Sequence, residues 1–226
     1  YFYMAITASL IPAHEVDADW LVVLVSDTPE FQGRIRDLDD VLGGTIRATI
    51  EQEDFEATPN EVLPLYQRAG VAATNLIVVG IGAAADCDVR CLRHGMLAGL
   101  RNCCMKAEQS VAMLVDEGVS EQISTSLVAE TFADTVVSGP VDADVYKAEL
   151  KRHPFADATL CLADTGDVEQ ALDTGAIVGS ACNVVKDLVN RNLMNAEGGG
   201  EIGGNNNVGS SIGRGTGANS NSKTGN

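Results

Sequence analysis

Uninterrupted apolar runs of strand length recur along the chain and set its expected architecture. Residues 76–79 read Leu-Ile-Val-Val and are followed by two glycines, Gly80 and Gly82. Residues 20–25 form a second run in which every position is apolar. Such runs are typical of strands that are buried on both faces, as in a parallel sheet covered by helices.

Less uniform patterns predict four further strands. Residues 45–50 alternate β-branched and polar side chains, which indicates a strand with one solvent-facing side. Residues 61–66 contain Pro64, which indicates an edge strand because proline cannot donate to a ladder. Residues 110–115 and 158–162 complete the expected strands.

Between these strands the apolar residues change to helical spacing. They recur every three or four positions over residues 89–103, which gives one face of a helix of about five turns. Residues 33–42 predict a shorter helix. Ser120 is the expected N-cap of the next helix. Asp167 is the expected N-cap of the last helix, because Gln170 follows it at the spacing of a capping box. Strands and helices therefore alternate, and the expected fold class is α/β with a mainly parallel sheet flanked by helices.

Composition divides the chain into three expected units. Residues 1–166 hold the alternating strands and helices and form the α/β domain. Residues 167–192 form a single amphipathic helix. Residues 193–226 are dominated by Gly, Asn and Ser and contain few apolar side chains, so we expect a disordered tail that cannot offset the entropy of ordering.

Charge narrows the classes of partner. The chain carries 32 acidic residues against 15 basic ones, a net charge of -17. This balance repels nucleic-acid phosphates and anionic lipid, so we expect neither nucleic acid nor membrane as a partner. No apolar run reaches the ~18 residues that a membrane span needs.

Six cysteines occur, and several fall on expected core faces. The chain is neither short nor rich enough in cysteine for a secreted disulfide scaffold. Reduced, buried thiols in a cytoplasmic protein are the expectation. The cysteines are at positions 87, 91, 103, 104, 161 and 182.

The glycines after the first run resemble a dinucleotide fingerprint. The segment from Gly80 to Ala85 fits G-x-G-x-x-A, which would make Gly80 and Gly82 cofactor-binding residues. The spacing favours a simple glycine turn instead. The helical period starts only near Asp88, and the next acid at a strand end is Asp116, too far along the chain for the ribose contact.

Other candidate chemistry is sparse. Cys87, Cys91 and His94 share a helix face, but a structural zinc site requires a fourth ligand. No nucleophile or metallopeptidase signature occurs, and the acids read as solvated surface. We therefore expect no catalytic residue and no metal ligand in this chain.

Three stretches together resemble the N-terminal domain and linker helix of the leucyl (cytosol) aminopeptidase family. They are residues 19–24, residues 75–82 with the helix that follows, and residues 175–190. The third is the most specific, because the family's linker helix ends in Arg-Asp-Leu-Val-Asn. Here Lys186 replaces that arginine.

The resemblance implies a macro-like domain that helps to assemble a homo-oligomer, a hexamer in this family. It also implies that two divalent metals, zinc or manganese, belong to a catalytic domain that this chain lacks. The family's metal-binding signature, Asn-Thr-Asp-Ala-Glu-Gly-Arg, is absent, and residues 195–198 match it by chance. The expected product is truncated and inactive alone.

The expected function is thus that of a non-catalytic assembly or regulatory domain of a cytoplasmic metallo-exopeptidase. Two alternatives come from other classes of protein. One is a macro-type module that binds a nucleotide or ADP-ribose through the glycine turn. The other is DNA binding, which some members of the family perform and which the net charge of -17 opposes.

Overall fold

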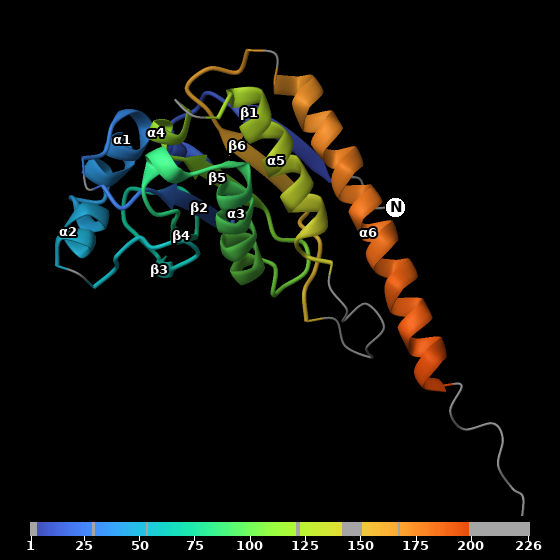
Figure 1. Cartoon of the computed structure of the whole chain (residues 1–226). Helices are drawn as coiled ribbons and strands as arrows, with labels where there is room; N and C mark the ends of the chain where they lie inside the picture. Colours follow the sequence, from blue (N-terminus) through green and yellow to red (C-terminus); the bar gives the residue numbers. More distant parts are fainter. Residues whose placement is uncertain are drawn as a thin grey trace, which may run out of the picture.

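A six-stranded sheet forms the centre of the molecule (Figure 1). The computed structural model describes residues 4–28, 30–52, 54–120, 123–141, 151–166 and 168–198. The strand order is β1-β6-β5-β2-β4-β3. The strands are β1 (Ala5–Ser9), β2 (Trp20–Val25), β3 (Val62–Tyr66), β4 (Asn75–Gly80), β5 (Val111–Val115) and β6 (Asp157–Cys161).

The sheet is mainly parallel, as the sequence predicts. Every neighbouring pair runs parallel except β3 and β4, which are antiparallel. The predicted edge strand containing Pro64 is β3, at one end of the order. The other edge, β1, was not predicted, because its residues alternate weakly and are exposed or half-buried.

Helices cover both faces of this sheet, so the predicted fold class is confirmed. On one side lie α1 (Gly33–Val41) and α2 (Thr45–Glu51), and on the other α3 (Val89–Cys103), α5 (Thr125–Ser138) and α6 (Val168–Gly198) (Figure 1). A single turn, α4 (Glu117–Ser120), precedes α5. Two 3-10 turns, η1 (Ala13–Glu15) and η2 (Ala84–Asp86), lie in loops.

The strands divide their side chains between two cores. Leu21 and Val23 of β2 face the layer of α1 and α2, whereas Val22 and Leu24 face the layer of α3 and α5. All four side chains are fully buried. This two-sided burial explains why the central strands read as continuous apolar runs.

The predicted strand at 45–50 is wrong, because these residues form α2. The Asp39 side chain, fully buried in α1, accepts hydrogen bonds from the amides of Ile46 (2.8 Å) and Arg47 (3.4 Å). Gly43 and Gly44 have φ of 68° and 77° and turn the chain sharply ahead of it. A side chain from the preceding helix thus caps the first turn of α2 and overrides the β-propensity of its residues.

The N-terminus of α5 also differs from the prediction. Ser120 belongs to α4, and the N-cap is Ser124, whose hydroxyl accepts from the amide of Leu127 at 3.3 Å. Both residues are serines, four positions apart, so the sequence alone does not show which one is the N-cap. Because Ser120 is used in the extra turn of α4, Ser124 caps α5. The predicted N-cap Asp167 lies outside the described residues.

The last helix is longer than the composition predicts. It continues to Gly198, beyond the expected boundary at residue 192. Its outer end projects past the rest of the molecule (Figure 1). Among the described residues no helix combines the length and apolar character that a membrane crossing requires.

Helix α6 packs on α5 through small and polar residues. A Cβ on Gly179 would lie 2.7 Å from the Asp134 carbonyl oxygen and 2.8 Å from Val137 Cβ, so the two helices approach closely here. Farther along, the Lys186 ammonium donates to the carbonyl oxygens of Ser138 (2.6 Å) and Val141 (2.9 Å). Lys186 therefore caps the carboxyl end of α5.

Candidate functional site

A cavity of about 660 Å³ lies where the parallel strands end. The chain leaves β2 toward α1 on one face of the sheet, but leaves β5 toward α5 on the other face. Ligands of open α/β sheets bind at such a reversal, outside the carboxyl ends of the strands. This cavity is therefore the candidate ligand site of the domain.

Asp116 joins the two strand ends beneath this cavity. Its Oδ2 accepts from the amide of Ser26 at 3.0 Å and from the Ser26 hydroxyl at 2.6 Å. Its Oδ1 accepts from the amide of Gly118 at 2.9 Å. A ribose contact would require an accessible carboxylate, but Asp116 is only 8 % exposed. This acid is therefore a structural link between β2 and β5.

Glu117 occupies the N-terminus of α1 at the edge of the same cavity. Its Oε1 accepts from the Arg34 amide at 3.1 Å. Gly33 has a φ of 51°, and a Cβ there would collide with the Glu117 carboxylate. The position where a helix would bind a ligand anion is thus filled by a carboxylate of the protein itself.

The charges around the cavity are mainly negative. Glu30, Asp116, Glu117 and Asp164 line it with one cation, Arg34. The Arg34 guanidinium donates to the carbonyl oxygens of residues 10 and 11. This arrangement opposes a phosphate-bearing ligand, because carboxylates repel it and the cation is engaged elsewhere.

Gly82, the second glycine of the fingerprint, lines another cavity of about 560 Å³. The Gly80 amide donates to Glu61 O (2.9 Å), and the Gly82 amide donates to Ala57 O (2.8 Å). A Cβ on Gly80 would collide with the carbonyl group of Ala57, and Gly82 has a φ of 69°. Both glycines therefore let the loop before β3 close on the end of β4, and both amides are used within the protein.

The cysteine and histidine motif does not assemble into a metal centre. Cys87 is buried, Cys91 is half-buried in the first turn of α3, and His94 is exposed one turn later. Across the described ranges, no three His, Cys, Asp or Glu side chains gather in a way that could hold a metal ion. Metal-assisted hydrolysis therefore has no ligand set in this part of the chain.

The other cysteines are free thiols, several of them in the core as predicted. Cys103, Cys104 and Cys161 are buried, and Cys182 is half-buried. Burial raises the pKa of Cys161 to about 11 and raises the pKa of Cys103 further. Cys103, Cys104 and Cys161 are protonated at neutral pH and serve as small apolar core residues.

Three residues with clear structural roles carry no motif that sequence reasoning could use. Asp39 and Glu117 each cap a helix from a distant position, and Arg93 of α3 donates from Nε to Asp134 Oδ2 of α5 at 2.8 Å. Each contact joins separate elements. Lys186, which caps α5, differs from these three residues. The sequence pointed to it because it lies in the segment that resembles the family's linker helix.

Comparison with known proteins agrees with the resemblance in the sequence. Residues 22–149 match the family model of the cytosol aminopeptidase family, N-terminal domain. The chain is an α/β domain of the type described above, and it belongs to this family.

Curated relatives extend the match. The chain is 29 % identical over 193 residues to a probable cytosol aminopeptidase of Solibacter usitatus, covering 83 % of this chain and 36 % of that protein. It is 22 % identical over 173 residues to the probable cytosol aminopeptidase of Bacillus subtilis, covering 75 % and 35 %. The chain thus spans little more than a third of the length of these relatives.

Solved structures share the fold. A mutant of tomato leucine aminopeptidase superposes with a TM-score of 0.63 at 17 % identity, covering 79 % of this chain and 36 % of that one. The bottromycin maturation enzyme BotP, in complex with Mn, superposes with a TM-score of 0.52 at 17 % identity, covering 76 % and 32 %.

Proposed function

We propose that this chain is a non-catalytic assembly and regulatory domain of a leucyl aminopeptidase-like metallo-exopeptidase. The observation that carries the proposal is the match of residues 22–149 to the N-terminal domain of that family. The catalytic metals, zinc or manganese, then belong to the portion of the relatives that this chain does not cover. A cytoplasmic location is part of the proposal, in keeping with the name of the relatives.

The outer surface of α6 supports an assembly role. The small residues of α6 pack against α5, whereas several of its large apolar side chains face solvent. Ile177 is 71 % exposed, and Val184 and Leu188 are 59 % and 55 % exposed. Several exposed, large apolar side chains on one helix are a mark of an interaction site. In a homo-oligomer, for which we propose the hexamer of the family, another copy of the chain would cover this surface. In a longer protein, a further part of the same chain would cover it.

Hydrolysis of leucine p-nitroanilide tests the catalytic half of the proposal. The purified chain, supplied with Mn²⁺ or Zn²⁺, is expected to release nitroaniline no faster than a metal-containing blank, because its described residues bring no ligand set together. Metal-dependent turnover that copurifies with the chain through two columns would contradict a non-catalytic role.

The macro-type alternative draws support from the cavity at the strand reversal. The carboxylates of Glu117 and Asp164 oppose it, since ADP-ribose carries two negative phosphates. Titration calorimetry with ADP-ribose is expected to show no binding at millimolar ligand. Saturable heat that Glu117→Gln strengthens would favour the nucleotide-binding function instead.

A further inference from the structure

Two cysteines flank the N-cap of α3, and neither has a role in the proposed assembly. Cys87 comes directly before Asp88, the N-cap of α3, and Cys91 lies in the first turn. Asp88 Oδ1 accepts from the Cys91 amide at 2.7 Å and so fixes the backbone of that turn. The cap holds the two cysteines at the same end of the helix.

The two thiols differ in access. Cys87 is 3 % exposed, whereas Cys91 is half-buried and lines the 560 Å³ cavity together with His94. The Cys91 thiol donates to the carbonyl oxygen of Ile81 at 3.2 Å. A reagent that enters the cavity therefore reaches Cys91 first.

Burial keeps the Cys87 thiol protonated. Burial raises the pKa of Cys87 to about 12, and the neighbouring Cys91 thiol adds to the rise. Cys87 thus stays protonated and protected. Cys91 instead lies in the first turn of the 15-residue helix α3, at the wall of the 560 Å³ cavity.

We propose that Cys91 is an oxidation site for hydroperoxides and that Cys87 converts the oxidised residue into an intrachain disulfide. The cavity supplies access, the capped helix turn positions Cys91, and the buried neighbour supplies the second sulfur. The inference concerns this domain alone and does not depend on the proposed aminopeptidase role.

The chemistry runs in two balanced steps. The Cys91 thiolate attacks the terminal oxygen of the hydroperoxide, the O–O bond breaks, and an alcohol (water, for hydrogen peroxide) leaves with the proton that the thiol released. Cys91 is then a sulfenic acid. The Cys87 sulfur attacks the Cys91 sulfur, the S–O bond breaks, and water leaves with the Cys87 proton. The dithiol loses two electrons, which the hydroperoxide gains.

The disulfide would fasten the loop after η2 to the first turn of α3. It would also remove the thiol that donates to Ile81 O, a residue at the end of β4. Both changes fall on the wall of the 560 Å³ cavity, so oxidation alters that cavity and leaves the distant α5 and α6 contact in place.

Peptide mapping tests this inference directly, because trypsin cleaves between the two cysteines. Cleavage after Arg68, Arg90 and Arg93 gives peptide 69–90, with Cys87 as its one cysteine, and peptide 91–93, with Cys91. The chain is treated with hydrogen peroxide, blocked with iodoacetamide and digested. We expect 69–90 and 91–93 joined by a disulfide, while peptide 102–106 keeps both of its thiols alkylated.

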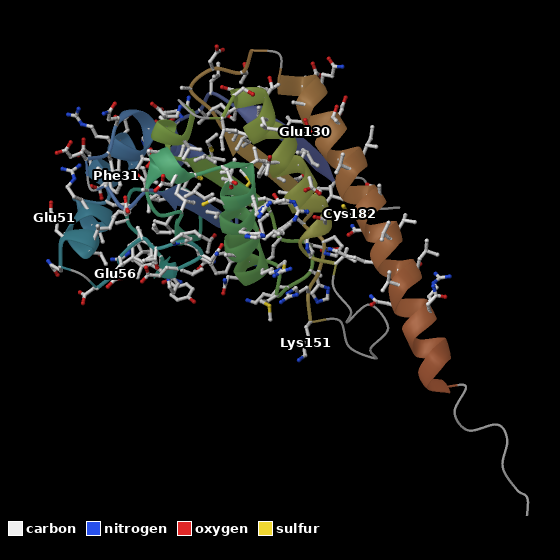
Figure 2. The ribbon with its side chains drawn as sticks, viewed as in Figure 1. Phe31, Glu51, Glu56, Glu130, Lys151 and Cys182 are labelled. Carbon is white, nitrogen blue, oxygen red and sulfur yellow. The ribbon has the colours of Figure 1, made fainter. Side chains whose placement is uncertain are left out.

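Variants separate the two roles. In Cys87→Ser, Cys91 should be captured by dimedone as a sulfenic acid. In Cys91→Ser, Cys87 should stay fully alkylatable by iodoacetamide after denaturation. The matched control is Cys182→Ser on α6 (Figure 2), which should leave the joined peptide unchanged. Circular dichroism checks that each variant folds.

Three results would overturn the inference. One is that Cys91 stays reduced at peroxide levels that oxidise peptide 102–106. Another is that Cys91 is recovered joined to peptide 153–186, which holds the other accessible thiol. The third is that Cys87→Ser and the unaltered chain give the same amount of dimedone-labelled Cys91, which would show that Cys87 does not resolve it.

Discussion

Gly175→Ala is expected to lower the free energy of unfolding by about 2 kcal/mol, even though alanine is the better helix former. Gly175 lies inside α6, and an added Cβ would collide with the Glu130 carbonyl oxygen and lie 2.9 Å from Ala133 Cβ. The obstacle is backbone of α5, on which Glu130 is labelled in Figure 2, so no side-chain movement relieves it. In a solvent-exposed helix the same change would stabilise by up to about 1 kcal/mol.

Urea unfolding followed by circular dichroism shows whether Gly175→Ala lowers or raises the free energy of unfolding. Ser180→Ala is the matched control, because Ser180 is an exposed residue of the same helix whose hydroxyl donates only to Ala176 O. Its stability should stay within about 0.5 kcal/mol of the unaltered chain. If Gly175→Ala proved as stable as Ser180→Ala, the close approach of α6 to α5 would be refuted.

The second large effect is self-association through α6. Val184, Val185, Leu188 and Val189 are each more than half exposed on the outer end of the helix. Static light scattering should show a molar mass that rises with concentration, because association removes this apolar surface from water. The expected mass at high dilution is that of the 23.7 kDa monomer.

A charged variant of the same surface provides the contrast. Val184→Glu combined with Leu188→Glu should give a monomer at every concentration, since burying two carboxylates in an apolar contact is costly. Met105→Glu, which charges an apolar residue that is 56 % exposed elsewhere, should associate like the unaltered chain. A strict monomer for the unaltered chain at several milligrams per millilitre would mean that the α6 surface does not bind to itself.

Sequence patterns located the central strands well because burial on both faces leaves a strong signature. The predicted run at 20–25 coincides with β2, and the run at 76–79 lies inside β4, which extends one residue farther at each end, to Asn75 and Gly80. The helix at 89–103 coincides with α3, whose spacing reflects one buried face. Elements that bury only part of their surface, such as β1, give no comparable signal.

Tertiary contacts explain where local patterns failed. Residues 45–50 have β-branched side chains, yet the Asp39 carboxylate supplies the cap that makes them helical. Nothing near residue 45 in the sequence reveals that contact. Glu117 likewise reaches the start of α1 from 83 positions away. Capping by distant side chains is invisible to propensity and periodicity.

The site could be predicted only in outline. The sequence favoured a glycine turn at Gly80 and Gly82, and in the structure both amides donate within the protein and the preceding loop packs closely against them. It did not reveal the larger cavity, because that cavity depends on the directions in which the chain leaves β2 and β5. Topology of this kind emerges only when the strand order is known.

Under the proposed function, this chain has no aminopeptidase activity by itself and supports a separate catalytic part. The most direct measurement compares leucine p-nitroanilide hydrolysis by the chain with hydrolysis by a fusion of the chain, through α6, to the remaining portion of the Solibacter usitatus relative. We predict no metal-dependent turnover for the chain and clear Mn²⁺-dependent turnover for the fusion. Turnover by the chain alone at the rate of the fusion would contradict the claim.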